Sequence, residues 1–455
     1  MKFYQLFHKT TLTRTWNGIP KIESGNSSKN LDQPNEKRVK FSNKCKSIVH
    51  YGINFILSPS CQKLFVAILC NIIWVCCGTA YTQIDNNGCV GGNFGIDAGL
   101  YSGIIEFGDG SPASGTTDWF EGTSGIGVID ESQTASLTTL LQGGGNPSYE
   151  VRMNSGFTSL VNGQIRVEAV FARDFFGGSG AADNTSFETA AKNGQDPANW
   201  DIGQSQVLGK NDLIDLAGFM FRNGENLTTG TPGDLWFVGL INRAEPGGNA
   251  YMDFEFLSED LELNSAPAPG DPGEGNFSSG GPDMGHTAYQ FDSATGEITL
   301  VGDFIFNTSL EGGVTPNVEV RLWVSYDDYT NITPAVGFSW GPEFDGAFNG
   351  APYGYASIIP NDNDLCGIIN QAGQTPPSPP WGSLGTKNNS YITEYAEYSV
   401  VEVGINMTAM GMDHASLQGS NPCDFPLNTF PRKSESQKER RLKLSTREWA
   451  KAFLI

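Results

Sequence analysis

Apolar and polar residues alternate with a period of two along much of the chain after residue 80. In Gln164–Arg173 the apolar residues alternate with Arg166 and Glu168, and Val318–Tyr326 has the same pattern. This period is that of a β-strand with one buried face. Similar stretches predict further strands at Gly103–Phe107, Leu235–Leu240, Tyr251–Leu257, Glu297–Phe306 and Tyr395–Met407.

Gly-rich turns separate these strands. Glu245-Pro-Gly-Gly-Asn249 lies between two of them and predicts a hairpin loop. The segment 264–285 is rich in Pro and Gly and predicts a surface loop inserted into a single domain. Many short strands without a sustained helix predict an all-β fold, an antiparallel β-sandwich of jelly-roll type with long Gly/Pro-rich loops.

Charge divides the chain into three parts. Residues 1–63 carry eleven Lys or Arg against three Asp or Glu, residues 432–455 carry eight against three, and residues 64–431 carry nine against 44. We therefore expect a disordered basic leader at 1–63, an exported β-sandwich domain at 81–431 and a basic tail at 432–455 that forms a helix or frays. The acidic domain excludes nucleic acid as a partner, because it repels phosphate.

The apolar run at 64–80 lies between the basic leader and the acidic domain. This order is typical of a chain that crosses a membrane with its front end left inside. Gly78-Thr79-Ala80 has the small residues that a signal peptidase reads, which favours cleavage before Tyr81 and a secreted or cell-surface protein. An uncleaved run would instead anchor the exported domain to the membrane.

Five of the eight cysteines precede or lie within the apolar run, so only Cys89, Cys366 and Cys423 belong to the exported domain. Three cysteines form at most one disulfide. We favour Cys366 with Cys423, because both lie in the same C-terminal stretch, over three unpaired thiols.

Asp253 and Glu255 alternate with apolar residues in Tyr251–Leu257, so both carboxyl groups face the same side of a strand. Their Cα atoms are about 7 Å apart, and the carboxyls could approach the separation of about 5 Å found in retaining glycosidases. The pattern resembles that of laminarinase-type hydrolases, which have three acids on a jelly-roll strand, but Tyr251 takes the first position here. We expect a polar outer face without catalysis, and keep the enzyme as the alternative.

Asp362-Asn363-Asp364-Leu-Cys-Gly367 begins like a calcium loop. Its twelfth position is Gly373 instead of Glu, which excludes an EF-hand. Asp362 and Asp364 are the candidates for a looser structural Ca²⁺ site, and the alternative is a solvated acidic turn.

Groups for nucleophilic catalysis are scarce. After residue 63 the only histidines are His286 and His414, and neither a Gly-x-Ser-x-Gly motif nor a zinc-ligand spacing occurs. Five tryptophans could stack on sugar rings or belong to the core: Trp119, Trp236, Trp323, Trp340 and Trp381.

Several stretches occur in an order that resembles an uncharacterised β-rich module of large secreted bacterial surface proteins, adhesin-like and linked to gliding-associated secretion. The resemblance covers about residues 90 to 426 and depends most on the Tyr-x-Asp-Phe-Glu-Phe strand at 251–256. It implies export and a β-rich fold, and it implies no catalytic residue. The basic tail after 432 departs from the continuation that such proteins have.

Together these patterns predict an exported cell-surface or secreted protein that acts in adhesion, by binding a glycan or the surface matrix. The alternative is a carbohydrate-active enzyme of the retaining type that uses Asp253 and Glu255.

Overall fold

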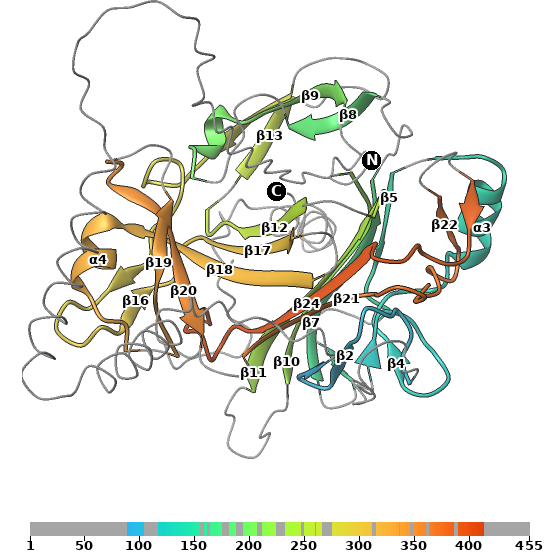
Figure 1. Ribbon diagram of the computed structural model, residues 1–455, viewed down its shortest axis with the longest axis horizontal. Coiled ribbons are helices and arrows are strands. Elements are labelled where there is room, and N and C mark those ends of the chain that lie inside the picture. The colour runs from blue at the N-terminus through green and yellow to red at the C-terminus, as the bar shows by residue number, and fades with distance from the viewer. Residues whose placement is uncertain are drawn as a thin grey trace, which may run out of the picture. The chain divides into compact units, whose positions relative to one another are not determined.

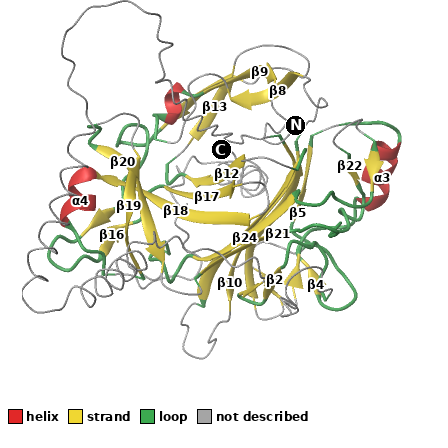
Figure 2. Cartoon of the chain, in the orientation of Figure 1, coloured by secondary structure: helices red, strands yellow, loops and turns green. Residues whose placement is uncertain are grey.

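The computed structural model describes residues 89–103, 117–146, 148–154, 159–161, 164–174, 182–187, 194–206, 212–223, 233–246, 250–259, 261–265, 275–311, 315–335, 337–345, 350–360, 364–385 and 390–413. The leader, the apolar run and the basic tail lie outside these residues. Strands in mainly antiparallel sheets make up most of the regular structure, so the all-β prediction is confirmed (Figures 1 and 2). The described helices are α3 (Thr134–Gln142), α4 (Tyr326–Asn331) and the 3-10 helix η1 (Pro197–Asn199).

None of these described helices has the length and apolar character that crossing a membrane requires. Helix α3 was not predicted from the sequence, because only Leu137 and Leu141 on it are buried. Two buried residues four positions apart are too few to give the apolar stripe by which an amphipathic helix is recognised.

A seven-stranded antiparallel sheet is buried on both faces. Along its central strands, Leu216 and Met220 pack into one apolar cluster while Phe219 and Phe221 pack into another. Burial of both faces explains why these strands are almost continuously apolar. The strands lie in the order β21 (Leu365–Ile369), β24 (Val400–Asn406), β11 (Asp234–Arg243), β10 (Leu213–Asn223), β7 (Gln164–Arg173) and β5 (Tyr149–Arg152), and β6 (Ser159–Val161) also pairs with β7.

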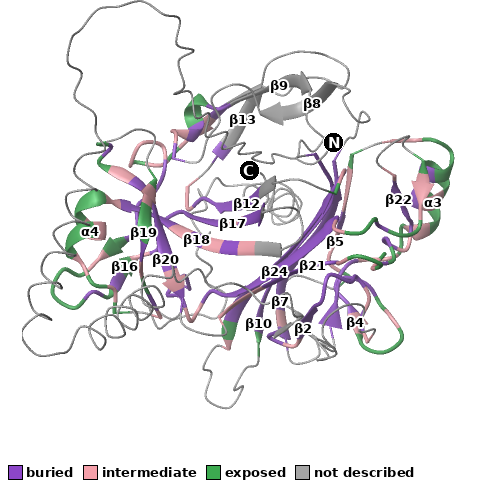
Figure 3. Cartoon of the chain, viewed as in Figure 1, coloured by how far each residue is buried: buried purple, intermediate pink, exposed green. Residues whose placement is uncertain are grey.

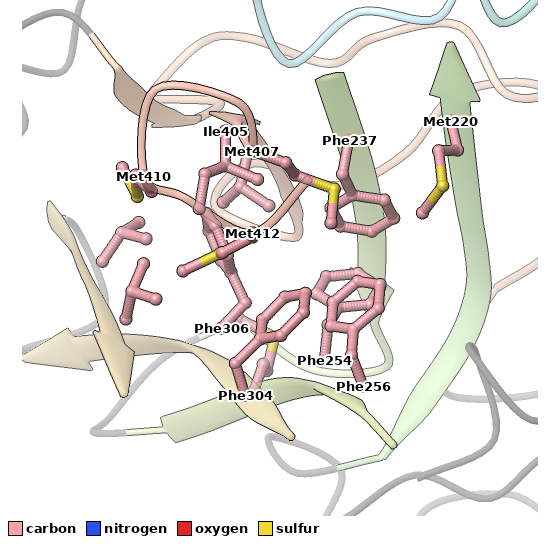
Figure 4. Close-up of a cluster of buried hydrophobic side chains, with 14 of the residues drawn as sticks. Met220, Phe237, Phe254, Phe256, Phe304, Phe306, Ile405, Met407, Met410 and Met412 are labelled. Carbon is pink, nitrogen blue, oxygen red and sulfur yellow. The ribbon is translucent and has the colours of Figure 1, made fainter. Parts of the chain in front are cut away.

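A five-stranded antiparallel sheet has one apolar face and one polar face. The apolar face joins the first sheet through the cluster drawn in Figure 4, in which the ring of Phe237 lies 5.4 Å from that of Phe254 and 4.9 Å from that of Phe256. Fully burying one such side chain stabilises the fold by about 1.5–3 kcal/mol. The strands lie in the order β12 (Ala250–Phe256), β17 (Phe304–Glu311), β18 (Thr315–Ser325), β20 (Tyr353–Pro360) and β19 (Phe338–Asp345).

Smaller sheets complete the described fold. Glu402 of β24 ties the first of them to the seven-stranded sheet, because its carboxylate accepts hydrogen bonds from the backbone N–H groups of Asp97 and Ala98 and from the indole N–H of Trp119, at 2.6–3.0 Å. The first four-stranded sheet has the strand order β1 (Cys89–Gly91), β2 (Phe94–Ile96), β3 (Thr117–Asp118) and β4 (Ile126–Gly127). The second has the order β13 (Leu261–Ser265), β14 (Gly275–Ser279), β9 (Asp201–Gln206) and β8 (Ala182–Phe187). The two-stranded sheets are β15 (Gln290–Phe291) with β16 (Ile298–Leu300), and β22 (Ser383–Leu384) with β23 (Tyr391–Ile392).

Three predicted strands have different bounds in the structure. The strand at 318–326 ends at Ser325, whose hydroxyl accepts a 3.0 Å hydrogen bond from Asp328 N–H and so caps α4. The stretch 297–306 forms β16 and β17 with a break at Gly302, where a Cβ atom would lie 2.4 Å from the Thr287 carbonyl oxygen. The strand at 395–407 begins only at Val400.

Two predicted loops were wrong. Glu245–Asn249 is not a hairpin, because β11 pairs with β10 and β24 whereas β12 pairs with β17, so the chain crosses between sheets there. The segment 264–285 contains β14, which pairs with β13 and buries Phe277. Gly103 lies in a turn with φ +71°, and the rest of the predicted strand 103–107 falls outside the described residues.

Candidate functional site

The polar face of the five-stranded sheet is the candidate functional site. The strand register places Asp253 beside Asn307 and then Glu319, and places Ile305 between Glu255 and Arg321. Successive side chains on a strand point to opposite faces, so all of these lie opposite the apolar cluster of Figure 4. The pattern of residues 251–257 thus predicted the shared face of Asp253 and Glu255 correctly.

Both predicted carboxyl groups are closed to solvent. Asp253 is 4% exposed and Glu255 is 1% exposed. Asn307 donates its side-chain N–H to Asp253, and the Tyr355 hydroxyl donates to Oε1 of Glu255, while Oε2 of Glu255 is buried without a hydrogen-bond partner. A glycosidase pair must contact the sugar, so this arrangement does not present the pair to a substrate.

Burial raises the pKa of Glu255 to about 7, against the opposing effects of the His286 charge and the Tyr355 hydrogen bond. The cause is the loss of water around the charged form, which destabilises a carboxylate in an apolar setting. Near neutral pH both the protonated and the charged form of this carboxyl are therefore populated.

His286 lies next to Glu255 and has an acceptor at each ring nitrogen. Nδ1 is 3.0 Å from Oδ2 of Asp303, and Nε2 is 3.0 Å from the Gln195 carbonyl oxygen. Burial alone lowers the pKa of His286, but the hydrogen bond to Asp303 and the nearby carboxylates outweigh burial and raise it. The ring also lies 4.2 Å from that of Trp323, a favourable position for an imidazolium over an indole.

This buried cluster of Glu255, His286, Asp303 and Tyr355 holds the chain from Asp283 to Tyr289 against the sheet. Trp323 donates its indole N–H to the Asp283 carbonyl at 3.1 Å, and Tyr289 N–H donates to the Trp323 carbonyl at 2.8 Å. Such hydrogen bonds satisfy polar groups that burial would otherwise destabilise. The cluster therefore holds the segment Asp283–Tyr289 over part of the polar face.

Nothing in the sequence assigned a role to His286. Its partners lie 17 residues away at Asp303 and 69 residues away at Tyr355, and only the strand register brings them together. Gly302 before Asp303 marks the close approach to Thr287, a signal that the sequence contains but that cannot be read without the partner strand.

Arg321 and three carboxylates lie further across the same face. Glu319 and Glu343 each approach Nη2 of Arg321, at 2.7 and 2.8 Å, and Asp345 lies 3.6 Å from Nη1. The side chains of Arg321 and Glu319 are 17% and 19% exposed, whereas those of Glu343 and Asp345 are 48% and 51% exposed. The face thus opens to solvent toward β19, whose exposed and partly exposed residues are green and pink in Figure 3.

Aromatic side chains lie on the opposite face of β19 from these carboxylates, because Phe344 stands between Glu343 and Asp345 in the strand and pairs with Ala356 on the side of the apolar core. The set consists of Tyr326 and Tyr329 on α4 and Trp340 and Phe344 on β19, and we call it the aromatic edge. Neighbouring rings lie 5.1–6.4 Å apart, Tyr326 is 54% exposed and the other three are partly buried. The Tyr329 hydroxyl and the Trp340 indole N–H each donate to a backbone carbonyl at 2.9 Å, which fixes their rings in place.

Position in the sheet explains why these rings remain accessible. β19 is the last strand of the five, and its pairing with β20 shifts register between Trp340 and Phe344. A bulged edge strand resists pairing with another chain and re-aims its side chains.

The other tryptophans belong to the interior. Trp119, Trp323 and Trp381 are fully buried and Trp236 is 9% exposed, so none of these four offers a face to a ligand. Trp340 alone among the five that the sequence suggested lies near the surface.

The predicted calcium residues are described only in part. Asp362 lies outside the described residues, while burial and then the Asp234 charge raise the pKa of Asp364. No group of three metal-ligating side chains occurs within the described ranges. The Ca²⁺ site stays a prediction, and melting curves with Ca²⁺ and with EDTA would test it, since a bound ion raises the midpoint.

Cys366 is disulfide-bonded. Its partner is not among the described side chains, and Cys423 lies outside the described residues, so the predicted pair stays a prediction.

Scans of the chain against protein-family models, curated proteins and solved structures found no match.

Proposed function

We propose that this protein is an exported, non-catalytic β-sandwich of jelly-roll type that binds glycan, and thereby mediates adhesion or matrix binding, through the aromatic edge. The observation that carries the proposal is the set of four neighbouring aromatic rings at the edge strand β19, led by Tyr326 at 54% exposure. Aromatic rings bind the C–H faces of sugars.

Burial of Asp253 and Glu255, the pair of acids that the sequence suggested, favours binding over hydrolysis. Asp253 and Glu255 are nearly inaccessible, and each accepts a hydrogen bond from an internal partner, Asn307 for Asp253 and Tyr355 for Glu255. The enzyme alternative has one feature in its favour, the pKa of about 7 at Glu255, which suits a general acid. A hydrolase would have to release the chain from Asp283 to Tyr289 before a sugar reached that group.

Export has support of its own. The order of basic leader, apolar run and acidic domain is that of an exported chain, and the disulfide at Cys366 is typical of an oxidising compartment. The proposed location is secreted or on the cell surface, and membrane-anchored through 64–80 if that run is not cleaved.

A matched pair of surface variants tests the binding role. Tyr326→Ala removes the most exposed ring, and we expect a roughly tenfold loss of affinity for a glycan identified on an array. Leu140→Ala is the control, because Leu140 is 44% exposed on α3 and should leave binding unchanged. Equal affinity of the two variants, or no glycan bound by the parent protein, would refute the proposal.

A further inference from the structure

The ring of His286 links segments of the chain that are distant in sequence. It lies between Asp303, which directly precedes β17, and Gln195, which belongs to residues 194–200, here called the η1 segment. Nδ1 is 3.0 Å from Oδ2 of Asp303, and Nε2 is 3.0 Å from the Gln195 carbonyl oxygen. The ring is fully buried, so water does not replace either partner. Whether both contacts are hydrogen bonds therefore depends on the protons that the ring carries.

Both of these oxygens act as acceptors. The Gln195 oxygen is a backbone carbonyl, and the Asp303 carboxylate also accepts hydrogen bonds from the backbone N–H groups of Ser258 and Thr287, at 2.7 and 3.1 Å. A neutral imidazole has one N–H, so one of its nitrogens would face an acceptor with a lone pair. Only the imidazolium, which has two N–H groups, satisfies Asp303 and Gln195 together.

The surroundings of the ring favour the imidazolium. Burial lowers the pKa of His286, but the hydrogen bond and charge of Asp303, the charge of Glu255 and the Gln195 carbonyl outweigh burial and raise it. The titratable side chains of the elements packed around the ring are Glu255 on β12, Asp303 before β17, Tyr353 and Tyr355 on β20, Asp196 in the η1 segment, and Asp283 and Tyr289 on its own segment. All of them are neutral or negative, so none repels the cation.

We infer that His286 is a pH-sensitive clamp, which as the imidazolium ties the η1 segment to the five-stranded sheet and on losing a proton releases that segment. The proton leaves Nε2 for solvent, because the hydrogen bond from Nδ1–H to a carboxylate is stronger than the one from Nε2–H to a neutral carbonyl. The lone pair of Nε2 then faces the Gln195 carbonyl, and two buried acceptors are left without a donor. Movement of the η1 segment removes this repulsion, while the bond to Asp303 keeps the ring on the sheet.

The first test reads the protonation state of His286. Long-range nitrogen–proton NMR spectra of the full chain, labelled in its histidines, distinguish the imidazolium from the two neutral tautomers, and His286→Asn identifies the signal among the four histidines. We expect the imidazolium at pH 6 and the neutral ring protonated at Nδ1 at pH 9. A neutral ring at pH 6, an imidazolium that persists at pH 9, or a neutral ring protonated at Nε2 would each overturn the inference.

The second test follows the release of the η1 segment by amide hydrogen exchange, corrected for the intrinsic effect of pH. The N–H groups of Ala198, Asn199 and Trp200 all donate to acceptors within this segment. We expect their protection to fall at least about tenfold between pH 6 and pH 9, while the amides of α3 keep theirs. Unchanged protection of the η1 segment, or an equal fall in α3 that indicates global unfolding, would overturn the clamp.

Variants separate the clamp from other titrations. His286→Asn keeps an N–H donor for Asp303 but has none for Gln195, so the η1 segment should have low protection at both pH values. Glu255→Gln removes a charge that favours the imidazolium, and the transition in protection should move about one pH unit lower.

Glu168→Gln is the matched control for Glu255→Gln. Burial raises the pKa of Glu168 to about 7 as well, but Glu168 lies on β7 and is not among the groups around the ring. We therefore expect its variant to have the transition of the parent protein. An equal shift in both variants, or a transition that persists in His286→Asn, would assign the effect to another group and overturn the inference.

Discussion

His286 and Asp303 are hydrogen-bonded between Nδ1 and Oδ2 at 3.0 Å, with 0% and 2% of their side chains exposed. The other ring nitrogen of His286 faces the Gln195 carbonyl, so a protonated ring finds an acceptor on both sides. Beside this pair, Oε1 of Glu255 accepts a hydrogen bond from the Tyr355 hydroxyl. Glu255 and His286, buried on the polar face, therefore both favour their protonated forms.

Stability should fall as the pH rises from 5 to 8. The pKa of Glu255 is raised from 4.5 to about 7 in the folded protein, so its contribution is fully present below pH 4.5 and is lost as the pH approaches 7. The raised pKa of His286 acts in the same direction above pH 6.5. The contribution from Glu255 amounts to roughly 3 kcal/mol across that window.

Urea unfolding at pH 5, 6, 7 and 8 would measure this effect in the parent protein and in Glu255→Gln. We expect the free energy of unfolding to depend less on pH in the variant, because the amide does not titrate. Glu168, whose pKa burial raises to about 7, leaves a residual slope in both proteins. Identical slopes in the two proteins would contradict the burial argument.

Removing Asp413 should destabilise the fold strongly. Its two oxygens accept hydrogen bonds from Nη1 and Nη2 of Arg222 at 2.7 and 2.8 Å, and the Arg222 side chain is 0% exposed. Asp413→Ala leaves this guanidinium buried without its carboxylate, at a cost of about 3–5 kcal/mol. Denaturant unfolding would measure it, with Glu150→Gln as the control, because Glu150 forms a partly exposed pair with Arg152 whose loss should cost about 1 kcal/mol or less. Similar losses in both variants would refute the assignment.

Local pattern predicted individual strands well because alternation depends only on neighbouring residues. The stretch Gln164–Arg173 is β7 with the same bounds, and 251–257 matches β12 closely. Pairing between strands was not predictable in the same way, because it depends on contacts between distant residues. The Gly-rich segment after β11 has the composition of a hairpin, yet β11 and β12 bury their apolar faces by packing in different sheets.

The same limit applies to the candidate site. Strand alternation predicted that Asp253 and Glu255 share one face, and that face was expected to be exposed to solvent. It is buried instead, because the segment Asp283–Tyr289 covers it, and nothing in the neighbouring sequence indicates this. The aromatic edge combines α4 with β19, and only Trp340 among its four residues was considered as a sugar-binding ring. The predicted strand 318–326 included Tyr326, the first residue of α4, and no helix was predicted after it, so Tyr326 and Tyr329 could not be assigned to a common surface.

The disulfide at Cys366 should stabilise the domain by about 2–4 kcal/mol. Peptide mapping without reduction would identify its partner, for which the domain offers Cys423, the residue favoured by the sequence, and Cys89, whose strand β1 contacts β21. We expect the Cys366 peptide to appear in a cross-linked pair and to resist alkylation until a reductant is added. Complete alkylation of Cys366 in the native, unreduced protein would contradict the structure.

The mature protein should begin at or near Tyr81 and should lie outside the cytoplasm. The reason is the combination of a basic leader, an apolar run that ends in Gly-Thr-Ala and an acidic domain with a disulfide, which together fit passage through a membrane into an oxidising compartment. N-terminal sequencing or intact-mass measurement of protein from the culture fluid and from the envelope would decide it. A membrane-bound form with an N-terminus before Leu64 would instead make 64–80 an anchor and keep the exported domain. A full-length form that is found only in the cytoplasm, with Cys366 reduced, would refute export and remove the setting in which binding to an extracellular glycan has a role.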